Sequence, residues 1–473
     1  MTKIVATIGP SSQDPEVLTH LVQAGVDVFR LNFSHGDQDT HIQSIEAIRK
    51  IEKTNGHPLA IMADLQGPKF RIGTFANDKI ELTAGHSFRL DSDKTPGDNT
   101  RVHLPHPEVI KAMSVGDDLL LDDGNVHLRI TATDNDALQS EVISGRTLSN
   151  HKGLNAPGVA IPISPLTKKD RDDLALAVEQ KVDWLALSFV QHPDDLKEAR
   201  RLIGGSPVKL LAKIEKQSAL MNLEELIKLC DGMMVARGDM GVESPIDEVP
   251  IQQRRILSVC RHAGKPVIVA TQMLESMREN PTPTRAEVSD VATAVYDGAD
   301  AVMLSAESAS GHYPVQAVTV MAGIISKVEN DQHYQPDDGG IHQPLEMSRS
   351  YQHTDAVVYA VSQAAKGLKS PMILSFTASG YTATRLSRER PKTPIIAVTD
   401  SIIVARQMMM NWGVRPFVPK EKIENFADLV DRAQDIGTGF GLVVPGDHMI
   451  ITAGVPFREP GITNIMRILT ITS

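Results

Sequence analysis

The sequence predicts a (β/α)8 (TIM) barrel that carries a small inserted antiparallel β-barrel lid domain and is followed by a doubly wound α/β domain. Three observations lead to this fold class. Eight short apolar runs alternate with helical patterns, one gap between these runs is too long for a barrel unit, and α/β alternation returns after a polar stretch. At 473 residues the chain is also long enough for two or three domains.

The apolar runs are interpreted as buried parallel strands. Runs of Val, Ile, Leu and Ala without polar alternation are typical of strands covered on both faces. A helical stretch follows each run, which favours a closed barrel over an open sheet. The capping box Thr284–Glu287 opens the helix that leads into the eighth strand. The predicted strands are Ile4–Ile8, Val26–Phe33, Leu59–Leu65, Trp184–Val190, Lys209–Ile214, Met233–Ala236, Pro266–Ala270 and Ala301–Leu304.

The spacing of the strand ends locates an insertion. Most ends are separated by about 30 residues, as in a barrel of about 250 residues. Asp64 and Ser188 are 124 residues apart, so about 90 residues are extra if one unit takes about 30. Between Phe70 and Pro162 polar and apolar residues alternate, as in Asn125–Ile130, and turn residues separate the runs. We therefore expect a β domain over residues 69–162, placed as a lid over a barrel made of residues 1–68 and 163–330.

The C-terminal part reads as a separate α/β domain over residues 340–473. A polar stretch, Asp331–Gly340, is interpreted as a linker or an exposed loop. Strands are expected near Met372–Phe376, Ile395–Val398 and Met449–Thr452, with a helix over Ala356–Gly367.

Composition narrows the class of partner. A net charge of -11 argues against nucleic acid or an anionic membrane as the main partner, although a local basic pocket could still bind small anions. Two cysteines, Cys230 and Cys260, are too few to stabilise a chain of this size by disulfide bonds. This fits a reducing, cytoplasmic setting. The apolar run Ile4–Ile8 is too short for a signal peptide, and no run reaches the roughly 18 residues of a membrane span.

Charged residues at the ends of two neighbouring strands are candidates for chemistry, because barrel enzymes build their sites there. Lys213 and Glu215 are two apart, so on a strand they share a face. Arg237 and Asp239 repeat this spacing after the next strand, and Gly238 between them lets a ligand approach the backbone. The alternative is a set of ion pairs that caps the barrel. Two adjacent strands that each supply a cation and a carboxylate favour a functional site.

Other strand ends add cations and hydroxyl groups to the same mouth. Arg30, Asn32 and Ser34 share one face of the second strand, and Thr271 ends the seventh. The alternative for Thr271 is the N-cap of the following helix.

Glu215 and Asp239 are hard oxygen ligands of the kind that Mg2+ prefers, and Mn2+ would serve similarly. Together with Lys213, Arg237 and Arg30 they predict an anionic, phosphorylated substrate.

Several long segments resemble pyruvate kinases, in the same order and around the same insertion. The match runs essentially from end to end. The segments are Ala6–Ser12, Arg30–Gly36, Ala212–Glu215, Val235–Gly241, Ala270–Met277 and Met303–Glu307.

The resemblance implies transfer of the phosphoryl group of phosphoenolpyruvate to ADP in a cytoplasmic, homotetrameric enzyme. By resemblance Glu215 and Asp239 bind the divalent metal, and Lys213 neutralises the phosphoryl group during transfer. The remaining implied contacts are substrate binding by Arg30, Arg237, Gly238, Asp239 and Thr271, and nucleotide binding by Arg71, Lys152 and His35. Protonation of the enolate would occur near Thr271. Phosphoryl transfer asks mainly for alignment and charge neutralisation, which this site supplies.

One region departs from the commoner family pattern. Where the family often reads Thr-Lys-Gly-Pro-Glu after the aspartate, this chain reads Leu-Gln-Gly-Pro-Lys after Asp64. It therefore resembles the branch that does not need K+. By resemblance Asn32, Ser34 and Asp64 form the monovalent-cation site, and the ammonium of Lys69 would replace the ion. The alternative is a solvated lysine at the lid hinge.

A loop in the last domain is a candidate effector site. Thr377–Thr382 lies between a strand and a helix start, a favourable place for phosphate. By resemblance Thr377, Ser379, Gly380 and Thr382 would bind a phosphorylated metabolite. An ordinary capped turn is the alternative.

Two other function classes compete with a phosphotransferase. A metal-dependent aldolase of pyruvate-type substrates also uses a barrel and a metal, but it would leave Arg71, Lys152 and the inserted domain unexplained. A catalytically inactive scaffold would not need both carboxylates, Lys213 and Thr271.

Overall fold

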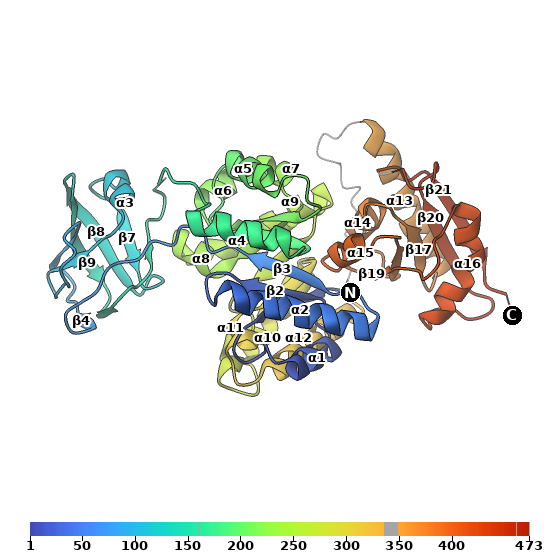
Figure 1. The fold of residues 1–473 in the computed structure, drawn as a ribbon, viewed down its shortest axis with the longest axis horizontal. Helices are drawn as coiled ribbons and strands as arrows, with labels where there is room; N and C mark the ends of the chain where they lie inside the picture. Colours follow the sequence, from blue (N-terminus) through green and yellow to red (C-terminus); the bar gives the residue numbers. More distant parts are fainter. Residues whose placement is uncertain (160, 335–348, 460, 473) are drawn as a thin grey trace.

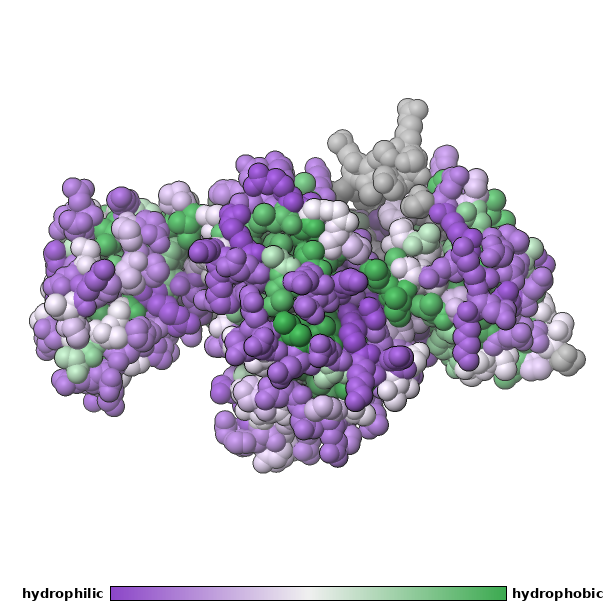
Figure 2. All heavy atoms as spheres, in the orientation of Figure 1, coloured by the Kyte–Doolittle hydropathy of each residue, from purple (hydrophilic) through white to green (hydrophobic). Residues whose placement is uncertain are grey.

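The computed structural model describes residues 1–159, 161–334, 349–459 and 461–472. Figure 1 shows three lobes in a row, with the barrel in the middle, the inserted domain at one end and the C-terminal domain at the other. The N-terminus lies at the junction of the barrel and the C-terminal domain. No helix among the described residues is long and apolar enough to cross a membrane. Hydrophilic residues cover most of the face in Figure 2, and hydrophobic residues gather on the middle lobe and at this junction.

The predicted barrel is confirmed. Its strands close in the order β1-β16-β15-β14-β13-β12-β3-β2, and every pair is parallel. All eight predicted runs supply a strand. They are β1 (Lys3–Ile8), β2 (Val28–Asn32), β3 (Ala60–Asp64), β12 (Trp184–Leu187), β13 (Lys209–Ile214), β14 (Gly232–Ala236), β15 (Val267–Ala270) and β16 (Ala301–Leu304).

Helices cover the outside of the barrel. The predicted capping box is present: Thr284 accepts from the amide of Glu287, whose side chain accepts from the amide of Thr284. The helices are α1 (Pro15–Ala24), α2 (Gln38–Asn55), α4 (Lys168–Glu179), α5 (Pro193–Ile203), α6 (Gln217–Met221), α7 (Leu223–Leu229), α8 (Arg237–Glu243), α9 (Val249–Ala263), α10 (Arg285–Tyr296), α11 (Ala306–Ala309) and α12 (Pro314–Glu329).

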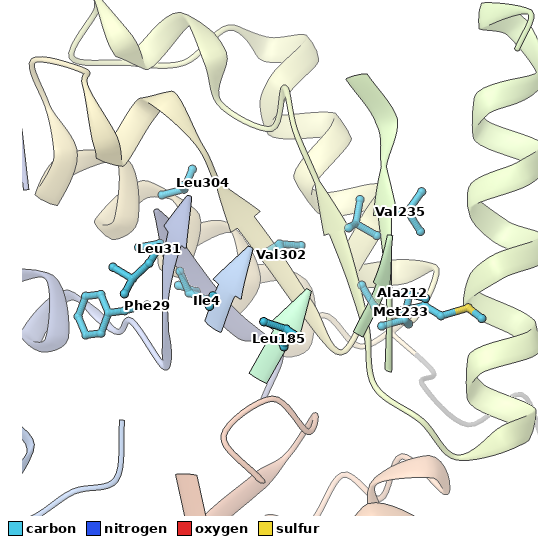
Figure 3. Packing of buried hydrophobic residues seen from close by; sticks show 14 of the residues in the cluster. Ile4, Phe29, Leu31, Leu185, Ala212, Met233, Val235, Val302 and Leu304 are labelled. Atoms are coloured by element: carbon cyan, nitrogen blue, oxygen red, sulfur yellow. The ribbon is translucent and has the colours of Figure 1, made fainter. Parts of the chain in front are cut away.

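Alternate strand residues build two different cores. Ile4 and Phe29 belong to the large outer cluster between strands and helices, part of which is drawn in Figure 3. Val5 and Val28, their sequence neighbours, belong to an inner cluster that also contains Met409 and Met410 of the C-terminal domain. Burying each large apolar side chain contributes roughly 1.5–3 kcal/mol. The C-terminal domain thus packs against the inner apolar core, and the charged side chains lie at the carboxyl ends of the strands.

The inserted domain is a β domain, as predicted, but its strands form two sheets rather than one small barrel. The larger sheet has the order β11-β7-β8-β9-β5-β6, and β10 pairs with β4 separately. The pairs are antiparallel except β5·β6, which is parallel. The strands are β4 (Lys79–Glu81), β5 (Ser87–Asp91), β6 (Arg101–His103), β7 (Asp118–Leu121), β8 (Val126–Thr133), β9 (Ala137–Ser144), β10 (Thr147–Ser149) and β11 (Leu154–Asn155), with helix α3 (Pro107–Ala112).

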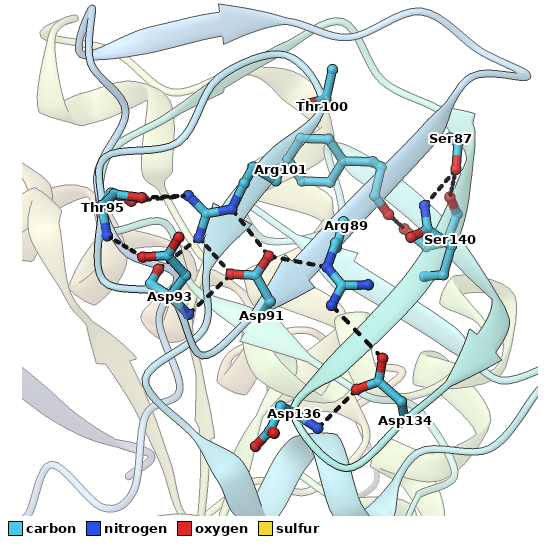
Figure 4. Close-up of polar contacts among 12 residues, drawn as sticks. Ser87, Arg89, Asp91, Asp93, Thr95, Thr100, Arg101, Asp134, Asp136 and Ser140 are labelled. Atoms are coloured by element: carbon cyan, nitrogen blue, oxygen red, sulfur yellow. Dashed lines mark hydrogen bonds and ion pairs between the residues drawn. The ribbon is translucent and has the colours of Figure 1, made fainter.

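Ion pairs join the ends of the two parallel strands β5 and β6. Arg101 of β6 bonds both carboxylate oxygens of Asp91 at the end of β5, and Arg89 bonds the same carboxylate (Figure 4). Arg101 also donates to the Thr95 carbonyl at 3.1 Å, which closes the β5–β6 connection. Alternation of polar and apolar residues cannot reveal such a pair, because both strand orientations share the same period.

The C-terminal domain is the expected α/β unit. Its sheet has the order β19-β18-β17-β20-β21, parallel except for the last pair. The three predicted strands are present, and the sequence prediction missed the two edge strands β19 and β21. The elements are β17 (Ile373–Phe376), β18 (Ile395–Val398), β19 (Val414–Phe417), β20 (His448–Ala453), β21 (Ile465–Thr470), α13 (Arg349–Leu368), α14 (Tyr381–Arg388), α15 (Ile402–Met408) and α16 (Phe426–Gly439).

The start of the predicted linker needs a correction. Tyr334 is only 4% exposed and packs in the outer barrel cluster, and Asp331 accepts a hydrogen bond from Tyr296 at 2.7 Å. Tyr334 is therefore buried and Asp331 is partly buried, whereas Gln332 and His333 between them are exposed, as expected for the predicted loop. Residues 335–340 of that linker and the expected domain start at 340 lie outside the described residues.

Candidate active site

A buried ammonium group lies at the centre of the barrel mouth. Lys213 Nζ donates to Ser188 Oγ at 2.7 Å and lies 2.9 Å from Glu215 Oε1 and 3.3 Å from Asp64 Oδ1. Burial lowers the pKa of Lys213, but attraction by Asp64 and Glu215 outweighs it and the net shift is upward. Lys213 therefore stays charged, with its charge shared between two carboxylates from β3 and the end of β13.

Arg30 of β2 forms the second cationic group. Its Nε donates to Asp64 Oδ2 at 2.7 Å and its Nη1 donates to Thr7 Oγ1 at 3.0 Å. Burial raises the pKa of Asp64, but Lys213 and Arg30 outweigh this and hold it below the ordinary value. The structure thus brings Arg30 and Lys213 to the two oxygens of one carboxylate.

Glu215 has the features of a metal ligand. It is fully buried, and its Oε2 accepts a hydrogen bond from the amide of Phe189 at 2.7 Å. Its Oε1 accepts no hydrogen bond with good geometry from the described residues, although Lys213 lies beside it. Burial and the nearby negative charge of Asp239 both raise the pKa of Glu215, and the positive charge of Lys213 lowers it. The net shift of the Glu215 pKa is upward. A buried carboxylate with a hard oxygen that lies 2.9 Å from a single ammonium group, and with a second carboxylate nearby, fits a divalent cation.

The local structure around Arg237 and Asp239 differs from the prediction. The strand β14 ends at Ala236, and residues Arg237–Glu243 form helix α8. On a helix, residues two apart do not share a face. Arg237 instead donates to Asp290 at 2.6 Å and to the Thr271 carbonyl at 2.7 Å, whereas the charge of Asp239 acts on Glu215.

Thr271 lies against the backbone of Gly238. Its Oγ1 accepts from the Gly238 amide at 2.8 Å and donates to the Ala270 carbonyl at 2.6 Å. The alternative of an N-cap is excluded, since the next helical turn begins at Glu275 with Leu274 as its N-cap. Thr271 has a φ of 70°, an unfavourable conformation for a β-branched residue. Such strain is typical of functional sites.

The three nucleotide-binding candidates lie on two domains. Arg71 and Lys152 are close in the inserted domain, where the amide of Ile72 donates to the Lys152 carbonyl at 3.0 Å. Lys152 pairs with Asp122 at 2.7 Å, and Arg71 donates to the His151 carbonyl at 2.9 Å. His35 is exposed in the loop after β2 of the barrel.

Two of the three residues predicted to bind a monovalent cation already have other partners. Asn32 Oδ1 accepts from the Ser34 amide at 3.2 Å, and Asp64 is held by Arg30 and Lys213. Lys69 and Asp64 are both described, and no hydrogen bond or ion pair joins them. Lys69 instead lies at the hinge, where its side chain passes beside Gly153. A Cβ atom added to Gly153 would lie 3.3 Å from Lys69 Cε.

A second lysine near this site was not predicted from the sequence. Lys169 Nζ donates to the Phe33 carbonyl, between Asn32 and Ser34, at 2.6 Å, and it pairs with Asp173 of its own helix. Its position in the first turn of the helix that follows the insertion was a local signal, but the partner is 136 residues away. No group of three or more His, Cys, Asp or Glu side chains suited to a metal is found among the described residues, so the candidate metal site rests on two carboxylates.

The candidate effector loop joins β17 to α14. Gly380 is the N-cap of α14 with a φ of 83°, which explains glycine at this turn. The hydroxyl of Thr382 is buried and hydrogen-bonded to that of Thr463 at 2.7 Å. Ser379 and Gly380 line a cavity of about 250 Å³ between this domain and the barrel, so the structure brings these two residues, but not the Thr382 hydroxyl, to an open space.

The fold and the charged mouth define a barrel enzyme that acts on an anionic substrate. Residues 1–318 match the pyruvate kinase barrel domain, and residues 355–469 match the pyruvate kinase alpha/beta domain. The chain therefore belongs to the pyruvate kinase family, and it is a phosphotransferase.

Individual relatives agree along the whole chain. A pyruvate kinase from Agrobacterium vitis is 47% identical over 99% of this chain and 96% of its own length. One from Methylorubrum extorquens is 46% identical over 100% of this chain and 97% of its own. The crystal structure of a pyruvate kinase from Cryptosporidium parvum superposes with a TM-score of 0.90 at 32% identity, covering 99% of this chain and 96% of that one. The aldolase and scaffold alternatives find no support in these matches.

Proposed function

We propose that this enzyme transfers the phosphoryl group of phosphoenolpyruvate to ADP, with Mg2+ or Mn2+ held by Glu215 and Asp239. The observation that carries the proposal is the buried carboxylate of Glu215, which faces the ammonium of Lys213 at 2.9 Å and lies close enough to Asp239 for the two charges to interact. A bound divalent cation would supply Lewis-acid polarisation and charge neutralisation at the substrate oxygens.

The chain's own groups would divide the remaining work. Lys213 and Arg30 lie at the two oxygens of Asp64 and would attract the phosphoryl group and neutralise its charge during transfer. The amide of Gly238 and the hydroxyl of Thr271, now bonded to each other at 2.8 Å, would orient the rest of the substrate. The hydroxyl of Thr271 would also lie near the carbon that takes a proton after transfer.

The inserted domain would hold the nucleotide and exclude water. Arg71 and Lys152 would contact the phosphates of ADP, and His35 would lie near the nucleotide on the barrel side. The Lys152 side chain, which pairs with Asp122, is 38% exposed. Its ammonium could therefore exchange the Asp122 carboxylate for a phosphate of the nucleotide. Exclusion of water prevents hydrolysis of the donor.

A coupled assay tests the proposal. Metal-stripped enzyme should form ATP from phosphoenolpyruvate and ADP only after Mg2+ or Mn2+ is added. Full activity in the presence of a strong chelator would overturn the metal assignment, and no ATP under any condition would overturn the reaction.

We also propose that the enzyme does not need K+. Three observations support this proposal. Lys69 replaces the acid that the family often has at this position, and Arg30 and Lys213 already neutralise the charge of Asp64. In addition, the ammonium of Lys169 donates to the Phe33 carbonyl. A tethered ammonium avoids the entropy cost of collecting a free ion.

We further propose a cytoplasmic homotetramer with a phosphorylated-metabolite effector near Ser379 and Gly380. Exposed apolar residues on the barrel helices and on strand β21 support self-association: Met221, Ile246, Ile251, Met466 and Ile468. Both cysteines are buried and free, which suits a reducing compartment. Light scattering on the purified enzyme tests the subunit count.

The domain boundaries that we propose are 68/69 and 162/163 for the inserted domain and 330/340 before the last domain. They are supported by the hydrophobic clusters, because the cluster of the inserted domain runs from Phe70 to Ile161 and its buried members include no residue of the barrel strands.

A further inference from the structure

A buried carboxylate connects the inserted domain to both elements that carry the candidate metal ligands. Glu243 is 2% exposed, and its Oε1 accepts from Asn155 Nδ2 at 2.7 Å and from Lys216 Nζ at 2.6 Å. Asn155 ends strand β11 of the inserted domain and is 8% exposed. The Glu243 side chain is thus a common acceptor for groups on two domains.

The two barrel-side connections lead directly to the metal ligands. Glu243 follows Asp239 by four residues on helix α8, so the two carboxylates lie on one face of the helix. Lys216 follows Glu215 in the chain, and its ammonium lies 5.9 Å from the centre of the Phe189 ring. A displacement of Glu243 would therefore be transmitted to both Asp239 and Glu215.

The other hinge segment of the inserted domain reaches the same place. Gly67 packs so closely on Phe189 that a Cβ at this position would lie 2.7 Å from the ring. The amide of Phe189 donates to Glu215 Oε2 at 2.7 Å. The Gly67 amide is in turn held by the buried carboxylate of Asp170 at 3.0 Å. Gly67 thus contacts Phe189, which bonds Glu215, and Asn155 reaches Lys216, the chain neighbour of Glu215, through Glu243.

We propose that Glu243 is a positioning residue, which couples the location of the inserted domain to the geometry of the metal site through its hydrogen bond with Asn155. Metal and substrate binding at the barrel mouth then move the inserted domain, and the inserted domain stabilises the bound metal in return. Coupling of this kind is reciprocal by thermodynamic necessity. The inference rests on the proposed metal site.

Asn155→Ala tests the connection and leaves the Lys216–Glu243 ion pair in place. The matched control is Asn150→Ala, since Asn150 accepts from Phe75 at 2.6 Å and donates to Asp78 at 3.1 Å, both within the inserted domain. Val115 is 64% exposed on the inserted domain, and the Arg201 side chain is 77% exposed on the barrel, so cysteines placed there accept a fluorophore pair. The native thiols are buried and burial raises the pKa of both, so they compete little for the label.

Energy transfer between the labels is measured in the full-length enzyme before and after Mg2+ and phosphoenolpyruvate are added, and Mn2+ affinity is measured separately by electron paramagnetic resonance. We expect a ligand-dependent change in energy transfer in the wild-type and Asn150→Ala enzymes and none in Asn155→Ala. We also expect Mn2+ affinity to fall about fivefold in Asn155→Ala only, the lower end of typical coupling. Similar thermal unfolding of the two variants would show that lost stability is not the cause.

Two results would overturn the coupling. One is a normal change in energy transfer in Asn155→Ala, and the other is its loss in Asn150→Ala as well. Mn2+ binding by the wild-type enzyme without any change in energy transfer would refute the coupling and leave the proposed function intact. Failure of the wild-type enzyme to bind Mn2+ would refute the proposed metal site and this inference with it.

Discussion

The ammonium of Lys213 lies 2.9 Å from the carboxylate of Glu215, two residues further along the chain, and both side chains are buried in the barrel mouth. This arrangement presents a cation and a hard oxygen ligand at one place. In the proposed mechanism the cation meets the phosphoryl group, and the oxygen holds the metal.

Replacing Lys213 with methionine should lower kcat for ATP formation about 100-fold or more, because a preorganised charge at developing negative charge is lost. The fold should persist, because Asp64 still accepts a hydrogen bond from Arg30 and Glu215 still accepts one from the Phe189 amide. Steady-state kinetics and circular dichroism check both expectations. The control is Lys197→Met, whose side chain is 60% exposed on α5. Activity of Lys213→Met within threefold of the wild type would contradict the assigned role.

Replacing Glu215 with glutamine should weaken Mn2+ binding about tenfold or more, because the charge of the oxygen ligands sets the affinity for a hard cation. Glutamine retains an oxygen for the Phe189 amide, so the local shape is kept. Metal titration followed by electron paramagnetic resonance measures the effect. Glu225→Gln, an exposed carboxylate on α7, is the control. An unchanged titration would show that the metal binds elsewhere.

The wild-type enzyme should lose little activity when K+ is omitted from a sodium-free buffer, because lysine ammonium groups supply the positive charge. Lys69→Glu should lose activity in that buffer and regain at least part of it when K+ is added. Initial rates over a K+ titration decide the outcome. Strong activation of the wild-type enzyme by K+ would refute potassium independence.

Phosphorylated metabolites at millimolar concentration should shift the phosphoenolpyruvate saturation curve, because the start of α14 offers backbone amides beside Ser379 and Gly380. Ser379→Ala should weaken the response to sugar phosphates or AMP and leave the curve without effector unchanged. If neither ligand shifts the wild-type curve, the last domain is not regulatory for these compounds.

The sequence alone determined the type and order of the eight barrel strands and of the three central strands of the last domain. The eight barrel strands were predictable because strands covered on both faces read as continuous apolar runs. The position of Glu215 and Lys213 at the end of β13 followed from the same pattern, since the two residues sit where the apolar run ends. Arg237 was misplaced because the apolar run of β14 does not show whether the next residues continue as a strand or turn into a helix.

Only the tertiary structure decided which side chains meet. Asn155 and Glu243 are 88 residues apart, and Lys169 and Phe33 are 136 apart, yet each pair is joined by a hydrogen bond. Lys69, which the sequence suggested as a partner of Asp64, lies instead beside Gly153. Local periodicity depends on residues within a few positions of each other, whereas such contacts depend on how the strands close into the barrel and how the inserted domain is placed on it.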